Sequence, residues 1–139
     1  GPFPPLRVER AASLFRELAG ETSPPTIIHG DMNPGNVLWD VREGWLAIDP
    51  KGYAGNPLYD VATFLNDPPG GLSVVELERF QTQRVAALAG ALETSREEIL
   101  AWAEAHAVLS AWWSYEDHGR GWEPVLALAE LYEGMLRSL

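Results

Sequence analysis

Residues 27–40 read IIHGDMNPGNVLWD, and this stretch decides both the fold and the chemistry that the sequence predicts. It places a histidine, two acids, two asparagines, two glycines and a proline between apolar residues. An ordinary turn needs far fewer residues of this kind. Because reactive groups are commonly presented by loops at the ends of buried strands, the first hypothesis is a functional loop.

The segments that flank this loop predict a small β insert. Residues 26–28 form a short apolar run before the loop. Two further runs, 37–39 and 45–48, follow it and are separated by turn residues 40–44. Short apolar runs between turn residues are typical of strands, and the last two runs predict a hairpin.

Pairing of those two strands would bring Asn36 and Asp49 to the same open end of the hairpin. An amide oxygen and a carboxylate form a site that suits Mg²⁺, because this ion takes few protein ligands and completes its shell with water and phosphate oxygens. Asp31, left off the metal, could accept a proton from a hydroxyl group. A base, two metal ligands and no nucleophilic serine or cysteine indicate phosphoryl transfer.

The rest of the chain predicts helices, so the expected fold class is mainly α with a small β-hairpin insert. Apolar residues recur at helical spacing in five segments. One expected buried stripe consists of Ile99, Trp102, His106, Leu109 and Trp113. The expected stop and cap signals are Gly20, residues 22–25, residues 68–71, Gly119, Ser73 with Glu76, Ser95 with Glu98, and Pro124.

Composition excludes several classes of protein. The 139 residues suffice for one domain, and the net charge of -10 argues against a nucleic-acid partner, which needs clustered Lys and Arg. The absence of cysteine excludes disulfides and thiolate metal sites. No apolar run is long enough to span a bilayer and no signal peptide opens the chain, so we expect a cytoplasmic protein without a membrane partner.

Two motifs in the correct order resemble those of a known family. HGDMNPGN at residues 29–36 fits the kinase pattern H-x-D-x-x-x-x-N, and IDPKG at 48–52 stands where D-F-G would be. With Gly30 in place of arginine, the loop resembles the aminoglycoside phosphotransferase family. Residues 46–65, LAIDPKGYAGNPLYDVATFL, resemble its branch of streptomycin 6-phosphotransferases and hydroxyurea-resistance kinases. The resemblance implies the C-terminal lobe of a protein-kinase-like α+β fold, with ATP as co-substrate and Mg²⁺.

The resemblance also assigns roles to the matching residues. Asp31 resembles the catalytic base that orients and deprotonates the substrate hydroxyl. Asn36 and Asp49 resemble the Mg²⁺ ligands that position the nucleotide. His29 resembles a histidine that braces the loop, and Asp60 resembles the aspartate that holds the loop backbone by hydrogen bonds.

Structural interpretations of these residues stay open. Asp31 and Asn36 favour turns for local reasons, and Asp49 before a proline is also common at a strand end. Lys51 departs from D-F-G and is either a phosphate contact or a solvated charge. His106 lies on an apolar stripe, where a core histidine is more common than a ligand.

Aromatic and acidic residues late in the chain suggest an acceptor site. The family places its acceptor among these helices, and Trp112, Tyr115, Glu116 and Asp117 could line a pocket for a sugar-like or cationic substrate. The alternative for Glu116 and Asp117 is a solvated acidic helix end.

The predicted function is an ATP-dependent O-phosphotransferase that acts on a small hydroxylated acceptor such as streptomycin. No glycine-rich phosphate loop and no strand lysine with a helix glutamate precede His29. We therefore expect residues 1–139 to be the catalytic and substrate-binding lobe, with the N-terminal nucleotide-clamping lobe absent. The isolated chain is expected to be inactive, and its inter-lobe surface, near the residues before Ile27, to promote self-association. The alternative is a non-catalytic fragment or binding module of kinase-like fold.

Overall fold

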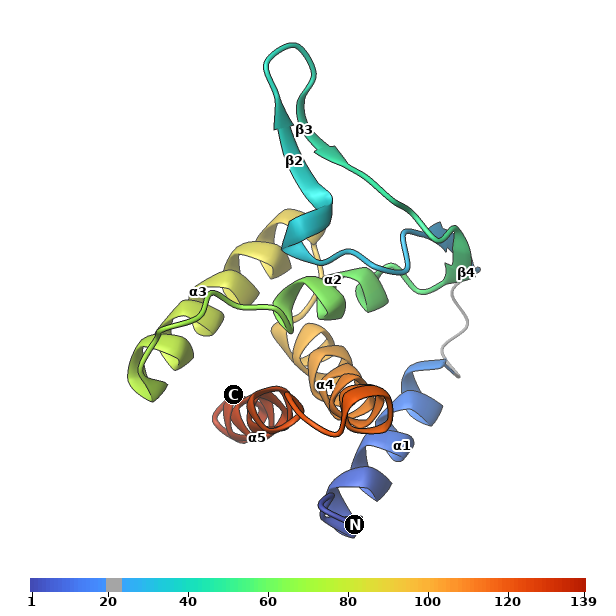
Figure 1. Cartoon of the computed structure of the whole chain (residues 1–139). Helices are drawn as coiled ribbons and strands as arrows, with labels where there is room; N and C mark the ends of the chain where they lie inside the picture. Colours follow the sequence, from blue (N-terminus) through green and yellow to red (C-terminus); the bar gives the residue numbers. More distant parts are fainter. Residues whose placement is uncertain (20–23) are drawn as a thin grey trace.

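The computed structural model describes residues 1–19 and 24–139. The predicted mainly helical fold with a small β insert is confirmed, whereas the expected stop at Gly20 and the first half of the break at 22–25 lie outside the described residues. The elements in chain order are α1 (Pro5–Ala19), β1 (Thr26–Ile28), the 3-10 turn η1 (Pro34–Asn36), β2 (Val37–Asp40), β3 (Gly44–Ala47), β4 (Tyr53–Gly55), α2 (Leu58–Leu65), α3 (Val74–Leu92), α4 (Arg96–His118) and α5 (Glu123–Arg137) (Figure 1).

Helix α4 forms the centre of the helical body. It packs against α1, α2 and α5, and Figure 1 shows it lying among these three helices. Ten of its residues are buried, several of them alanines that allow close helix approach. The stripe prediction is right for Ile99, Trp102 and His106, which are buried, and Leu109 is only partly buried. It is wrong for Trp113, which lies beyond the last buried residue, Ala111, and is 45% exposed.

Charged residues are built into this body. The Arg10 guanidinium on α1 donates two hydrogen bonds to Glu104 on α4, whose carboxylate is almost fully buried. Arg7 donates to Glu133 on α5 at 3.0 Å. A buried carboxylate needs such partners because desolvation of an unpaired charge is costly. None of the described helices has a stretch long and apolar enough to cross a membrane.

The capping predictions differ in outcome. Ser73 forms a complete capping box, because its hydroxyl accepts from the Glu76 backbone N–H and the Glu76 carboxylate accepts from the Ser73 backbone N–H. Ser95 forms only half of one. Its hydroxyl accepts from the Glu98 N–H at 3.1 Å, but the Glu98 carboxylate accepts from the Thr94 hydroxyl at 3.0 Å. The neighbouring threonine therefore takes the place of the second cap bond.

The β insert consists of two separate antiparallel pairs. The predicted hairpin is confirmed as β2–β3, with Leu38 opposite Leu46 and Trp39 opposite Trp45. The strand at 26–28 is also confirmed, but its partner β4 was not predicted. Strand β4 is only three residues long and pairs with β1 across more than twenty residues of chain, so no local pattern marks it.

Helix α2 is held at its C-terminal end by side chains from α3 and α5. Arg84 donates to the Phe64 carbonyl oxygen at 3.0 Å. Gln81 and the Tyr132 hydroxyl both donate to the Leu65 carbonyl oxygen, at 2.6 and 3.1 Å. Gln81 and Tyr132 are fully buried. These bonds satisfy carbonyl groups that the end of a helix leaves without intrahelical partners.

His106 is a core histidine, as expected, and it joins α4 to α2. The Asn66 amide donates to its Nδ1 at 2.9 Å, so the ring proton is on Nε2, which lies 3.3 Å from the Thr63 hydroxyl. Burial lowers the pKa of His106 to about 4. The ring is therefore neutral near pH 7.

Candidate active site

The loop between β1 and β2 lies beside the open end of the hairpin. Strand pairing ends at Val37 opposite Ala47, and the Ile48 N–H donates to the Asn36 carbonyl oxygen at 2.8 Å, one position further along. Asp49 directly follows Ile48. The hairpin therefore places Asn36 and Asp49 at the same end, as the sequence predicted.

Asp60, in the first turn of α2, binds the backbone of the loop. Its two carboxylate oxygens accept hydrogen bonds from the N–H groups of His29 and Gly30, at 2.8 and 2.9 Å. Hydrogen bonds to an ionised acceptor are stronger than neutral ones. The carboxylate thus attaches the residue before Asp31 to the helical body.

Both ring nitrogens of His29 are engaged within the protein. Its Nε2 lies 2.6 Å from the Ile48 carbonyl oxygen, and its Nδ1 lies 3.1 Å from the Asp31 backbone nitrogen. A carbonyl oxygen only accepts and a backbone N–H only donates, so the proton is on Nε2 and Nδ1 is the acceptor. This neutral tautomer connects the loop to the end of the hairpin and leaves no ring nitrogen for a substrate.

The Asp31 carboxylate is half-buried and faces two amides. Asn33 Nδ2 lies 3.2 Å from its Oδ1, and Asn36 Nδ2 lies 3.3 Å from its Oδ2. Asn36 Nδ2 also donates to the Asp31 carbonyl oxygen at 2.9 Å. The long amide contacts orient the carboxylate while leaving it room for another donor. Asn33 was not predicted as a site residue, although its position two residues after an aspartate is typical of local side-chain hydrogen bonding.

Gly30 is required at its position for a steric reason. Its φ is +86°, and a Cβ atom there would lie 2.7 Å from Tyr53 Cδ2 and 3.0 Å from Lys51 Cβ. The sequence marked Gly30 only as the replacement of an arginine. The structure adds the cause, which is that the ring of Tyr53 on β4 lies against the loop backbone.

The segment after the hairpin has a strained backbone at Asp49. Its φ is +55°, in the left-handed region that costs a residue with a side chain about 1–2 kcal/mol. Two residues later, the Lys51 N–H donates to the His29 carbonyl oxygen at 2.7 Å, while the Lys51 side chain is exposed. Such strain is concentrated at functional sites, where the surrounding contacts maintain it.

The donor atoms at this end of the hairpin fit a magnesium ion. Asn36 directs its Nδ2 at Asp31, so its Oδ1 points elsewhere, and no described residue donates a hydrogen bond to that oxygen. Asp49 supplies an exposed carboxylate. Among residues 1–19 and 24–139, no group of three or more His, Asp or Glu side chains is arranged to hold a metal. A site here would therefore have two protein ligands and complete its shell with water and phosphate, which is usual for Mg²⁺.

The expected acceptor residues lie on the last turns of α4 and do not form one pocket. Trp112 and Tyr115 pack on Phe3, with ring centroids 5.5 and 5.7 Å away, and Tyr115 also contacts Trp122. The structure brings these two into an aromatic cluster near the start of the chain and not onto the loop. Glu116 and Asp117 are exposed, and neither forms an ion pair with a described residue.

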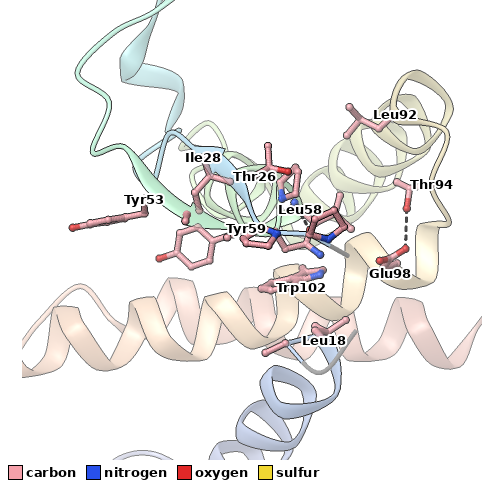
Figure 2. Close-up of a pocket in the computed structure, with 17 residues that line it drawn as sticks. Leu18, Thr26, Ile28, Tyr53, Leu58, Tyr59, Leu92, Thr94, Glu98 and Trp102 are labelled. Carbon is pink, nitrogen blue, oxygen red and sulfur yellow. Dashed lines mark hydrogen bonds between the residues drawn. The ribbon is translucent and has the colours of Figure 1, made fainter. Parts of the chain in front are cut away.

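A cavity of about 890 Å³ lies next to the β1–β4 pair (Figure 2). Ile28, Leu58 and Trp102 contribute apolar surface, and Tyr53 and Tyr59 line the side nearest the loop. Figure 2 shows the two phenol rings pointing to the same side, away from Glu98. The cavity and the loop therefore share these two tyrosines.

Comparison with protein families identifies the chain. The model of one family of kinases matches residues 5–118, which is most of the chain. That family is described as "Aminoglycoside/hydroxyurea antibiotic resistance kinase", and the chain belongs to it. The resemblance noted in the sequence is thus confirmed.

Curated relatives agree with this assignment. The chain is 33% identical to a streptomycin 6-kinase of Streptomyces glaucescens over 88% of its own length, and 34% identical to a hydroxyurea phosphotransferase of Kitasatospora aureofaciens over 76%. It is 32% identical to a streptomycin 3''-kinase of Klebsiella pneumoniae over 77%. The chain covers 40%, 29% and 41% of the lengths of these relatives, respectively. No solved structure matches the chain.

Proposed function

We propose that the protein to which this chain belongs transfers the γ-phosphoryl group of ATP to a hydroxyl group of a small molecule, with Asp31 as the base. The observation that supports this most directly is the half-buried Asp31 carboxylate, oriented by the amides of Asn33 and Asn36. Membership in a kinase family supports the reaction class. The relatives named as streptomycin kinases support an aminoglycoside as the acceptor, and the hydroxyurea phosphotransferase supports a smaller one.

The loop residues have distinct tasks in this reaction. The acceptor hydroxyl donates a hydrogen bond to Asp31, and its oxygen attacks the γ-phosphorus. As that O–P bond forms, the bond from the γ-phosphorus to the bridging oxygen of ADP breaks, and the hydroxyl proton passes to Asp31. His29 braces the loop and is not the base, because its only unprotonated nitrogen already accepts from the Asp31 N–H. Asp60 fixes the backbone that carries Asp31.

Asn36 Oδ1 and the Asp49 carboxylate would hold Mg²⁺, which neutralises phosphate charge when it is bound. The exposed Lys51, two residues after Asp49, would contact a phosphate oxygen of the nucleotide. Both assignments place the nucleotide phosphates at the open end of the hairpin, beside Asp31.

The chain would act as the C-terminal lobe of this enzyme, covered on the hairpin side by a nucleotide-clamping lobe. The side chains of Trp39 and Trp45 are 62% and 70% exposed, although their ring centroids are only 5.3 Å apart. Ile27, on β1 of the other strand pair, is 82% exposed. Figure 1 shows the hairpin projecting from the helical body. Without such a lobe we expect the isolated chain to bind ATP very weakly and to self-associate through these residues.

A magnesium titration of two variants of the complete protein tests the site. Asp31→Asn keeps the side-chain shape but removes the proton acceptor, so turnover should fall about 10²-fold or more at every magnesium concentration. Asp49→Asn removes one charge from the metal site, so its activity should recover in part as magnesium is raised. Phosphorylated product is measured with streptomycin and a panel of hydroxylated acceptors.

Near-normal turnover of Asp31→Asn on every acceptor that the wild type phosphorylates would show that the loop is only structural. A complete protein that phosphorylates none of the acceptors, yet binds one of them, would instead favour a non-catalytic binding module.

A further inference from the structure

Three aromatic side chains, Tyr53, Tyr59 and Trp113, extend from the loop towards the exposed end of α4; we refer to them as the aromatic wall. Tyr53 lies against the backbone of Gly30, the residue before Asp31. Tyr59 directly precedes Asp60, which binds the same backbone. Burial raises the pKa of Tyr59, and the negative charges of Asp60 and Asp31 raise it further, so its phenol lies within electrostatic reach of the proposed base.

His106 links the second and third members of the aromatic wall. Its ring meets Tyr59 edge to face, with centroids 5.1 Å apart, and meets Trp113 in the same way at 6.5 Å. Bonds from Asn66 and to Thr63 fix this ring. Because the imidazole is neutral near pH 7, it places no positive charge between the two rings.

The aromatic wall offers open ring surface to a ligand. Tyr53 is 59% exposed and Trp113 is 45% exposed, while Tyr59 is half-buried. The residues of the described chain form no hydrogen bond with either phenol or with the Trp113 indole. Trp113 is therefore not explained by the core, because it is a large apolar side chain on the outside of α4.

The surroundings of Trp113 are acidic. Glu116 and Asp117 follow it by three and four residues, which places them on the same face of α4 one turn away. Both are exposed and without an ion pair among the described residues. His118 and Arg120 come next, but the left-handed Gly119 turns the chain away from the helix between them. An indole face next to carboxylates is suited to a guanidinium or ammonium group.

We propose that the aromatic wall binds the acceptor and that Trp113 is the residue that selects a cationic one, with a guanidinium or ammonium group over its indole and a hydroxyl at Asp31. The proposal rests on the proposed function for the position of the reacting hydroxyl. It differs from the sequence prediction, which placed the acceptor on Trp112 and Tyr115, because those rings pack on Phe3 at another face of the helix.

The neighbouring tryptophans provide a matched pair for the test. Trp112 and Trp113 are adjacent on one helix and are 42% and 45% exposed. Calorimetric titration without nucleotide measures binding of streptomycin, which carries guanidinium groups, and of myo-inositol, a neutral polyol, to the complete protein. We expect Trp113→Leu to weaken streptomycin binding about five-fold, and Trp113→Phe to weaken it less. Trp112→Leu should leave the affinity unchanged, and myo-inositol binding should not depend on either tryptophan.

The double variant Glu116→Gln, Asp117→Asn provides a second measurement that does not disturb packing, because both side chains are exposed. We expect it to weaken streptomycin binding and to reduce the dependence of that binding on salt. Equal effects of Trp112→Leu and Trp113→Leu, or no streptomycin binding by the wild type, would overturn the proposal. Because no nucleotide is present, a Trp113-dependent affinity would stand even if Asp31→Asn kept its turnover and the proposed function failed.

Discussion

The two ends of helix α2 are held in different ways. At its first turn, Asp60 accepts two hydrogen bonds from the loop backbone, and the surroundings are only partly buried. At its last turn, Gln81 and Tyr132 donate to the Leu65 carbonyl oxygen, and all three residues are fully buried. One helix thus joins a half-exposed polar network to a buried one.

Because of this difference, we expect the two ends of α2 to contribute to different properties of the protein. A buried polar group without a partner costs about 1–3 kcal/mol, whereas a partly exposed group regains water. We therefore expect substitutions at the buried end to lower stability, and substitutions at the loop end to lower activity far more than stability.

The largest expected effect is on acid stability, through His106 at the buried side of α2. Its pKa of about 4 in the folded protein lies below the ordinary value of 6.5, so the unfolded chain binds the proton more readily. The contribution of His106 to stability is complete above pH 6.5 and is lost as the pH falls towards 4, on the order of 3 kcal/mol. Urea unfolding of wild type and His106→Gln from pH 7 to 4 measures this. Parallel pH curves for the two proteins would disprove the assignment.

At the loop end, Asp60→Asn should reduce turnover about 10²-fold, since displacement of a catalytic group by about 1 Å has effects of this size. The asparagine has a single acceptor oxygen, so one N–H of His29 or Gly30 loses its partner. Asp67→Asn, an exposed acid just beyond α2, is the control. A melting temperature that fell in proportion to the rate would contradict the separation of the two ends.

At the buried end, Gln81→Leu should lower the free energy of unfolding by about 2 kcal/mol, because the Leu65 carbonyl oxygen and Arg84 each lose a partner. Gln83→Leu, two residues away and exposed, should change it by no more than about 0.5 kcal/mol. Activity at low temperature should match that of the wild type. If Gln81→Leu reduced the rate of the folded enzyme strongly, the buried network would also have a role in catalysis.

The smallest effect concerns Gly30 after removal of its steric neighbour. In the Tyr53→Ala background the ring that would lie 2.7 Å from the new Cβ atom is gone. Gly30→Ala should then lower the free energy of unfolding by about 1–2 kcal/mol, because an alanine still has to adopt a left-handed φ and its Cβ atom still lies close to Lys51 Cβ. With Tyr53 present the cost should be larger. Thermal unfolding of the two single variants and the double variant gives the coupling, and strict additivity would show that Tyr53 does not confine Gly30.

Local patterns were sufficient for much of the fold. The hairpin β2–β3, the helices and the Ser73 box depend on residues a few positions apart, and these were predicted. The Ser95 box was wrong in one half because Thr94 competes for the same carboxylate. The predicted burial of Trp113 was wrong, because helical spacing shows which residues share a face but not where along the helix the neighbouring elements end.

The sequence by itself determined the family and the set of polar side chains in the loop, because the spacing of His29, Asp31, Asn36 and Asp49 is fixed by a short piece of chain. Only the tertiary structure decided the β1–β4 pairing and the position of Tyr53 against Gly30. It also decided that Trp113 contacts His106 whereas the adjacent Trp112 packs on Phe3. Gln81 and Tyr132, fifty-one residues apart, both donate to the Leu65 carbonyl oxygen. Such contacts arise from the packing of distant segments, whose free energy depends on how surfaces fit and not on any spacing along the chain.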